Sequence, residues 1–294
     1  MKHRRFWPLL ICILLAGMLC APVLAGDYPE YREPPQLPEG GPTFTEEPVS
    51  CVSRGNTLRG VLTLPEGDGP FPMAILTHGL ATDHRWCDDI AWALADHGVA
   101  SVRFDFAGTG ASDGAQEDMT ISSEVYDVAA ILDFVEAQDY TDRGNIIMVG
   151  KSMGGVDVLL ASLGRQDQVK ALVLWYPGFS VTELARRGFL LGQPFFPFDP
   201  PDSITVSGYT FGQAFIREAQ AMDWEDACRR YQNPVLILHG DRDIVTPLPA
   251  SIVASQTFPD CRLTVIPGGM HGFFGFQELY ALGEMLDFVL EQID

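Results

Sequence analysis

The fold is decided by the stretch Ile146-Ile147-Met148-Val149-Gly150-Lys151-Ser152-Met153-Gly154-Gly155. Its first four residues form an apolar run that predicts a buried strand, and apolar residues at helical spacing predict a helix that begins near Met153. Residues 150–154 match the pattern G-x-S-x-G, in which the glycines let the chain turn sharply and leave the Ser152 hydroxyl above the sheet. A serine that only caps the helix would also fit this turn. The strand before it and the helix after it favour a nucleophilic serine.

Further apolar runs on both sides of this stretch alternate with helical patterns. Strands are expected at Val49–Ser53, Leu58–Leu64, Met73–Leu76, Ala100–Phe104, Ile146–Val149, Ala171–Leu174, Val235–Leu238 and Leu263–Val265. Helical spacing is found in Trp86–His97, Ile121–Ala137, Met153–Leu163 and Tyr280–Ile293. Several strands are apolar throughout, as a sheet covered on both faces requires. We therefore expect an α/β fold with a mostly parallel eight-stranded sheet and helices on both faces.

Composition divides the chain into three segments. Residues 1–25 form a separate leading segment, and the prolines and glycines of residues 26–48 predict an extended leader that is not a domain. Residues 49–294 are expected to fold as one domain. Within it, residues 178–233 add about 56 residues without a clear strand, and an insertion of this length is usually functional. We expect this insertion to be a small cap over a site.

The first 25 residues have the pattern of a secretion signal. A basic start is followed by an apolar run over residues 6–19 and by small residues up to Ala25. The run is shorter than the roughly 20 apolar residues that a membrane helix needs. We expect export to the periplasm or the medium, a mature chain that starts at Gly26, and no stable membrane anchor.

The charge of the mature chain excludes one class of partner. After removal of residues 1–25, the chain carries 39 acidic and 16 basic residues, and its only lysines are Lys151 and Lys170. No basic stripe is present that could neutralise a phosphate backbone. We therefore expect no nucleic-acid partner, and the oligomeric state stays open.

Four cysteines remain in the mature chain, namely Cys51, Cys87, Cys228 and Cys261. An even number in an oxidising compartment is compatible with one or two disulfides, for which three complete pairings exist. Cysteines also pack as small apolar residues, so buried free thiols are the alternative.

A serine nucleophile needs a base that is oriented by a carboxylate. In the expected topology the chain order is serine, acid, histidine. His271 is the only histidine after the acid candidates, which makes it the base. Asp241 and Asp243 compete as the acid, and we favour Asp243 because the second acidic position of such a loop usually reaches the histidine. Asp241 would then shape the turn.

Backbone donors must stabilise the oxyanion that forms when the serine attacks a carbonyl. The strand Met73–Leu76 ends in Thr77-His78-Gly79-Leu80, where such a loop is expected. The predicted donors are the N–H groups of Leu80 and of Met153, the residue after the nucleophile. No metal and no cofactor are expected to take part.

These motifs resemble those of the α/β-hydrolases and, more narrowly, of bacterial cinnamoyl (feruloyl) esterases. The resemblance covers roughly residues 50–294 and rests on residues 78–79, 101–106, 108–114, 150–155, 239–243 and His271. It implies Ser152 as nucleophile, His271 as base, Asp243 as acid, and a cap between the sixth and seventh strands of the core. Lys151 and Leu80 depart from the family pattern, in which a histidine and an aromatic residue are more usual.

Together these features predict a serine hydrolase that cleaves carboxylic esters, with aromatic or medium-chain acyl groups, through an acyl-enzyme. A serine aminopeptidase-like or thioesterase-like hydrolase is the alternative within the same fold, because fold and triad do not determine the leaving group. A catalytically silent binding protein of this fold is a third interpretation. The expected partner is a small-molecule ester substrate.

Overall fold

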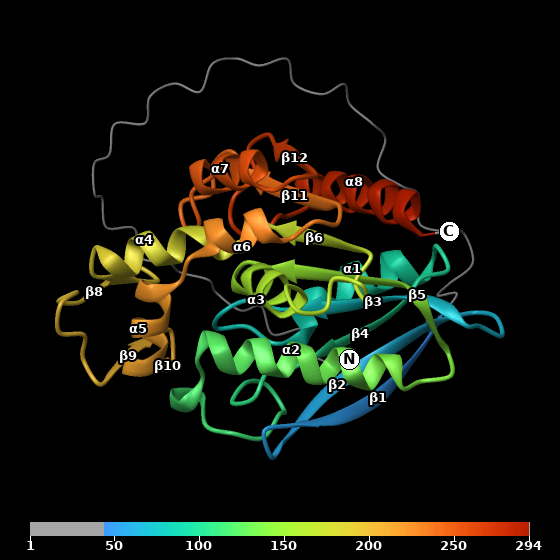
Figure 1. The fold of residues 1–294 in the computed structure, drawn as a ribbon, viewed down its shortest axis with the longest axis horizontal. Coiled ribbons are helices and arrows are strands. Elements are labelled where there is room, and N and C mark those ends of the chain that lie inside the picture. Colours follow the sequence, from blue (N-terminus) through green and yellow to red (C-terminus); the bar gives the residue numbers. More distant parts are fainter. Residues whose placement is uncertain (1–43, 294) are drawn as a thin grey trace, which may run out of the picture. The chain divides into compact units, whose positions relative to one another are not determined.

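The computed structural model describes residues 44–293 and contains one eight-stranded sheet (Figure 1). The strand order is β1-β2-β4-β3-β5-β6-β11-β12, and every pairing from β4 to β12 is parallel. Strand β2 is antiparallel to both β1 and β4. The strands are β1 (Phe44–Ser53), β2 (Asn56–Pro65), β3 (Phe71–Thr77), β4 (Ala100–Phe104), β5 (Thr141–Lys151), β6 (Ala171–Trp175), β11 (Val235–Gly240) and β12 (Cys261–Ile266). The predicted mostly parallel α/β sheet is confirmed.

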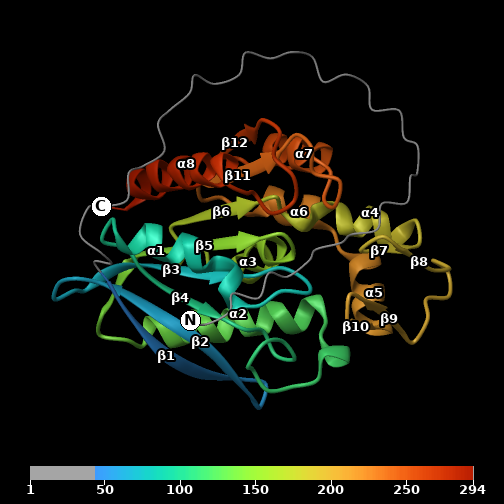
Figure 2. The same cartoon turned by 180° about the vertical axis from the view of Figure 1, so that it is seen from behind.

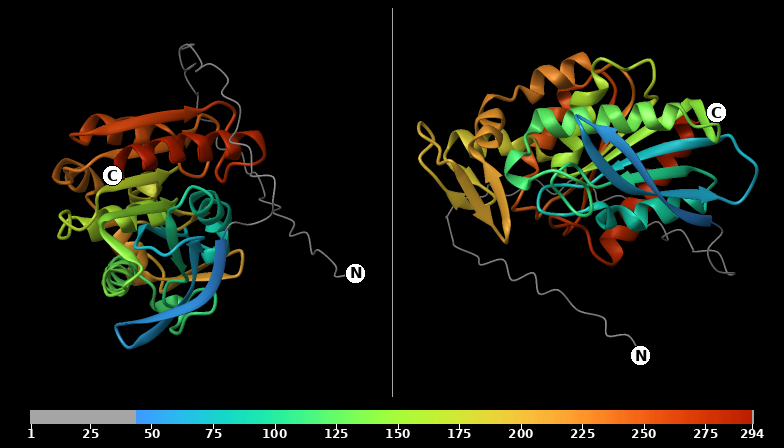
Figure 3. Two further views of the ribbon diagram at one scale, coloured as in Figure 1. Left: turned by 90° about the vertical axis from the view of Figure 1, so that its right-hand side faces the viewer. Right: turned by 90° about the horizontal axis from the view of Figure 1, so that it is seen from below.

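Alternating residues of the central strands build two separate cores. Met73 and Ile75 of β3 belong to the core on one face, whereas Ala74 and Leu76 belong to the core on the other. Helices α2 and α3 cover the first face, and α1 and α8 cover the second (Figures 2 and 3). The long helices are α1 (Asp88–Ala95), α2 (Ile121–Glu136), α3 (Met153–Ser162), α7 (Pro249–Thr257) and α8 (Phe276–Gln292), with short 3₁₀ helices at η1 (His84–Cys87) and η2 (Gln116–Asp118). No helix of residues 44–293 has both the length and the apolarity that a membrane crossing requires.

Strand β1 begins earlier than the sequence predicts. Residues 44–48 were expected to end an extended leader, but they pair with β2 from Phe44 onward. Pro48 is tolerated because β1 is the edge strand of the sheet. Glu46 adds a tertiary anchor, since its carboxylate lies 2.6 Å from Arg103 Nη2 and accepts the indole N–H of Trp92 at 2.9 Å. The predicted signal segment and residues 26–43 of the leader lie outside the described residues.

The predicted insertion lies between β6 and β11 and is more regular than expected. It was expected to have no clear strand, yet it contains two short hairpins next to three helices. Its elements are η3 (Gly178–Ser180), α4 (Val181–Arg186), β7 (Phe189–Leu190), β8 (Gln193–Pro194), β9 (Ser203–Val206), β10 (Tyr209–Gly212), α5 (Gln213–Ala221) and α6 (Trp224–Arg230). Leu191-Gly192 and Ser207-Gly208 form the turns with positive φ at both positions, as two-residue hairpin turns require. Strands of two to four residues are too short to show a period in the sequence.

The four cysteines of residues 44–293 are free thiols. Cys87 and Cys228 are buried, and Cys51 and Cys261 are partly buried. Of the two alternatives, disulfides or free thiols that pack as small apolar groups, the structure shows the second.

A buried carboxyl without a hydrogen-bond partner lies between helices α3 and α2. Neither side-chain oxygen of Asp157 has a partner among residues 44–293, and the side chain is fully buried. Burial, followed by the nearby Glu124 and Asp127, raises the pKa of Asp157 well above its usual value. Asp127 itself is paired with Arg54 at 3.2 Å. The Asp157 carboxyl is thus easier to keep neutral in the folded chain than in the unfolded chain.

Asp157→Asn should therefore stabilise the protein at pH 8. The folded chain binds the Asp157 proton more tightly than the unfolded chain, so this contribution to stability is complete below the unfolded pKa of about 3.9 and is lost as the pH rises. At pH 8 the unfolded chain releases this proton without cost, whereas the folded chain must retain it or bury a charge, and this difference should be about 1–3 kcal/mol. Thermal unfolding at pH 4 and pH 8 measures the effect. Asp118→Asn, which alters an exposed side chain, is the control, and an Asp157→Asn protein that melts below wild type at pH 8 would contradict the interpretation.

Candidate active site

Ser152 lies on a strained turn between β5 and α3. Its backbone has φ 55° and ψ −120°, a conformation that a non-glycine residue adopts rarely. A Cβ on Gly150 would lie 2.3 Å from the carbonyl oxygen of Gly154, and a Cβ on Gly154 would lie 2.5 Å from that of His78. Both flanking glycines are therefore required by close backbone packing. The turn has the geometry predicted from the G-x-S-x-G pattern.

His271 bridges Ser152 and Asp243. Its Nε2 lies 3.0 Å from Ser152 Oγ, and its Nδ1 lies 2.8 Å from Asp243 Oδ2. Asp243 follows the end of β11, and His271 follows the end of β12, so neighbouring parallel strands bring the two loops together. In this arrangement Nδ1–H donates to the carboxylate and Nε2 is free to accept the serine proton.

Asp243, rather than Asp241, contacts the histidine. Oδ1 of Asp243 accepts the N–H groups of Val245 at 2.8 Å and Thr246 at 2.9 Å. Burial alone would raise the pKa of Asp243, but the hydrogen bond and charge of His271 together with the Thr246 N–H hold this pKa below its usual value. The exposed Asp241 accepts the N–H of Gly268 at 2.7 Å and so links its turn to the loop of His271.

Two further residues beside the triad, Thr246 of this loop and His239 of β11, were given no role by the sequence-based interpretation. Thr246 Oγ1 lies 3.0 Å from Asp243 Oδ2 and 3.1 Å from His271 Nδ1. His239 lies 2.6 Å from the Thr246 carbonyl oxygen, and burial lowers the pKa of His239 to about 4. His239 is therefore neutral at pH 7 and supports the loop. The sequence did offer one signal for Thr246, because a threonine three residues after an aspartate can hydrogen-bond to the carboxylate.

The loop after β3 passes directly over the nucleophile. A Cβ on Gly79 would lie 2.7 Å from Ser152 Cβ, so the next peptide, which carries the Leu80 N–H, begins beside the serine. Met153 is the first residue of α3, and first-turn amides have no partner within their own helix. The N–H groups of Leu80 and Met153 therefore belong to the two backbone segments that lie at Ser152, and their role as oxyanion donors stays a prediction.

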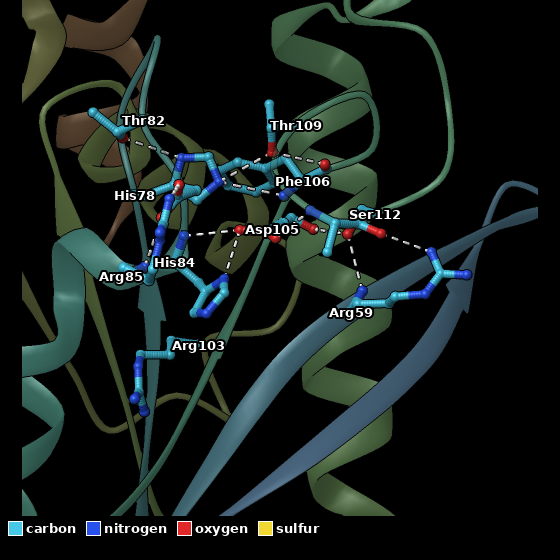
Figure 4. A network of polar contacts seen from close by, with 12 residues as sticks. Arg59, His78, Thr82, His84, Arg85, Arg103, Asp105, Phe106, Thr109 and Ser112 are labelled. Carbon is cyan, nitrogen blue, oxygen red and sulfur yellow. Dashed lines mark hydrogen bonds and ion pairs between the residues drawn. The ribbon is translucent and has the colours of Figure 1, made fainter. Parts of the chain in front are cut away.

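A buried polar network supports this loop (Figure 4). His78 Nδ1–H donates to the Gly79 carbonyl at 2.9 Å, while Nε2 accepts the Phe106 N–H at 3.3 Å. Burial lowers the pKa of His78, which agrees with a neutral ring in these two bonds. Asp105 accepts the N–H and the Nδ1–H of His84, each at 2.8 Å, and the N–H of Ala111 at 2.7 Å. The loops that follow β3 and β4 are therefore tied together by these hydrogen bonds.

The same network contains the one group within residues 44–293 whose side-chain atoms lie close enough together to share a metal ion. It consists of Asp83, His84 and Asp105. Asp83 is paired with Arg85 at 2.5 Å, and Asp105 with His84 at 2.8 Å. The oxygen and nitrogen atoms that could bind a metal are thus engaged in ion pairs with protein groups. We interpret the cluster as a structural support of the loop.

A family model named serine aminopeptidase, S33 matches residues 70–196. Mouse palmitoyl-protein thioesterase ABHD10 is 26% identical over 211 residues, which cover 67% of each chain. An uncharacterised 31.7 kDa protein of Escherichia coli is 32% identical over 112 residues, 37% of this chain and 38% of the relative. The match to this bacterial protein thus spans well under half of its length, whereas the match to the mouse enzyme spans about two thirds.

Solved structures match over almost their whole length. Est1E from Butyrivibrio proteoclasticus with bound ferulic acid is 33% identical, with a TM-score of 0.78 over 83% of this chain and 98% of Est1E. Mouse ABHD10 shares the fold, with a TM-score of 0.66, 21% identity, and coverage of 84% and 100%. The nucleophile turn, the sheet order and these matches together show that the chain belongs to the α/β-hydrolase family, in which its relatives include esterases and thioesterases.

Proposed function

We propose that the protein is a serine hydrolase of carboxylic esters. The observation that carries the proposal is the hydrogen-bonded chain from Ser152 Oγ through His271 to Asp243, with distances of 3.0 and 2.8 Å. A hydroxyl in contact with an imidazole, which in turn contacts a carboxylate, is the arrangement that makes serine nucleophilic. Similarity to Est1E, whose structure holds ferulic acid, supports ester substrates.

The reaction would proceed in two halves. In the first, Ser152 Oγ forms a bond to the carbonyl carbon while its proton moves to His271 Nε2, and the N–H groups of Leu80 and Met153 stabilise the oxyanion. His271 then gives this proton to the leaving alcohol, and an acyl-enzyme remains. In the second half, water loses a proton to His271, attacks the ester carbon, and releases the acid as the proton returns to Ser152. Asp243 stabilises the imidazolium in both halves.

Thioesters are the second candidate substrate class. The specific observation is the similarity to palmitoyl-protein thioesterase ABHD10, which is 31% identical in its human form over 58% of this chain. The same triad can release a thiol or an alcohol, since the acyl half of the reaction is common to both. A comparison of kcat/KM for an oxygen ester and a thioester that carry the same acyl group distinguishes the two substrate classes.

The cap provides apolar side chains that would suit an acyl group. The exposed fractions of Phe196 and Phe198 are 66% and 86%, and their rings meet edge to face at 5.8 Å. Phe179, Phe211 and Phe215 are instead buried in the core. Exposed aromatic rings are available to a ligand, whereas the buried ones hold the cap, so we propose that the exposed pair favours apolar acyl groups.

Butyryl and hydroxycinnamoyl esters should be hydrolysed with a higher kcat/KM than the acetyl ester of the same alcohol. Each methylene buried in an apolar site contributes about 1–3 kcal/mol to transition-state binding, so the butyryl ester should gain at least about tenfold. Replacing Phe196 and Phe198 with serine should reduce this preference and leave acetate hydrolysis unchanged. A wild-type preference for acetate would reject the acyl preference but not the triad.

A further inference from the structure

The residue before the nucleophile is a buried lysine. The exposed fraction of Lys151 is 2%, and its Nζ donates to the Trp86 carbonyl oxygen at 2.6 Å. Nζ also lies 5.4 Å from the ring centroid of Trp86 and 5.2 Å from that of Trp175, which is its partner across β5 and β6. No direct ion pair joins Lys151 to a carboxylate of the described residues, and the acidic group whose charge it influences is the partly buried Glu278. Burial of an ammonium that contacts only one carbonyl oxygen and two indole faces destabilises the folded state, because the charge loses its hydration.

Trp86 lies between the two loops that serve Ser152. A Cβ on Gly79 would lie 3.0 Å from Trp86 Cζ3, and a Cβ on Gly272 would lie 3.7 Å from Trp86 Cζ2. The indole centroid is 6.2 Å from the His271 ring and 5.8 Å from the ring of Tyr176. The six-membered ring of this indole therefore lies against both the loop of the predicted oxyanion donor Leu80 and the loop of the base.

We propose that Lys151 is a positioning residue for the triad and acts through Trp86. The hydrogen bond to the carbonyl oxygen holds the backbone of Trp86, and the cation–π contact holds its ring. Because Lys151 is next to Ser152 in the chain, the nucleophile and the indole share one anchor. The indole that Lys151 holds in place lies between the Gly79–Leu80 peptide and His271, and so determines their distances from Ser152. This inference rests on the proposed function of Ser152.

The proposal predicts that stability and turnover respond in opposite directions. Lys151→Met replaces the ammonium with an uncharged chain of similar length and removes the penalty of burying a charge that has no directly paired carboxylate. The Tm should therefore be unchanged or higher. Release of the indole should lower kcat by about tenfold to a hundredfold, since displacements of about 1 Å in an active site have effects of this size. KM should change much less, because Lys151 is buried away from the substrate.

A double-mutant cycle tests whether the effect passes through Trp86. Lys151→Met, Trp86→Leu and the double variant are assayed for kcat on one ester. If Lys151 acts by holding the indole, its replacement should have little further effect once the indole is absent, so the double variant should be no slower than the slower single variant. Effects that multiply would overturn the proposal.

Controls separate this inference from the proposed function. Lys170→Met removes the only other lysine of the mature chain, which contacts Asn145 at 2.8 Å, and should leave kcat unchanged. An active Ser152→Ala protein would reject the proposed function itself. An inactive Ser152→Ala protein beside a fully active Lys151→Met protein would reject only the positioning role. A lower Tm or an unfolded Lys151→Met protein would also reject it, because an essential structural role predicts that result.

Discussion

Ser152→Ala is expected to abolish ester hydrolysis almost completely while the protein stays folded. Loss of the nucleophilic serine in a serine protease lowers kcat by about 2 × 10⁶-fold, and the remaining rate comes from the oxyanion hole and substrate binding. Ser152 is buried to 9% exposure and its Oγ contacts His271 at 3.0 Å, so alanine removes one hydrogen bond and little volume. The ratio of kcat values and the Tm of the purified variant measure the two parts of this prediction.

A phosphonate that mimics an ester identifies the reacting side chain independently of the rate. It should add its mass to the peptide that contains Ser152 and to no peptide of the Ser152→Ala variant. Ser255→Ala is a matched control, because the Ser255 hydroxyl, within residues 44–293, bonds only to the Ile252 carbonyl on α7 at 2.9 Å and should be dispensable for turnover. Labelling of another serine would contradict the assignment.

The nucleophile turn could be predicted because its signals are local. A strand, two glycines that are required by backbone contacts of 2.3 and 2.5 Å, and a helix all lie within about 20 consecutive residues. The alternation of Met73, Ala74, Ile75 and Leu76 between two cores was also readable, because a run that is apolar at every position predicts a strand covered on both faces. Local sequence patterns were therefore sufficient to predict both the sheet and the position of Ser152 at the end of a strand.

The supports of the site could not be predicted in the same way. Trp86 lies against Gly79 and Gly272, which are far from each other in the chain, and only the folded structure brings these loops together. The buried Asp157 breaks the expectation that a helix face toward the core is apolar, and its neighbours Glu124 and Asp127 come from a different helix. Contacts of this kind depend on tertiary packing, for which one sequence carries no periodic signal.

Asp243→Asn should lower kcat by about 10⁴-fold, and Asp241→Asn should change it by a few-fold at most. The larger figure is the loss measured when asparagine replaces the triad aspartate of a serine protease. An amide beside His271 Nδ1 cannot stabilise the imidazolium and favours the tautomer that carries the proton on Nε2, which then cannot accept it from Ser152. Asp241 accepts one backbone N–H at the surface, a role that the oxygen of asparagine can also fill. Steady-state kinetics on one ester compares the two variants.

The loss of activity in Asp243→Asn should be measured as a function of pH. A carboxylate that orients His271 gives a loss that does not change with pH, whereas a carboxyl that exchanges protons near neutral pH gives a loss that does. Burial would raise the pKa of Asp243, but the hydrogen bond and charge of His271 and the Thr246 N–H hold this pKa below its usual value, so the carboxylate stays charged well below neutral pH. The ratio of wild-type to Asp243→Asn activity should therefore stay large from pH 6 to pH 8. A larger loss in Asp241→Asn than in Asp243→Asn would assign the acid to Asp241 instead. The contact of 2.8 Å between Asp243 and His271 would then have to break during turnover, because only one carboxylate can hold Nδ1.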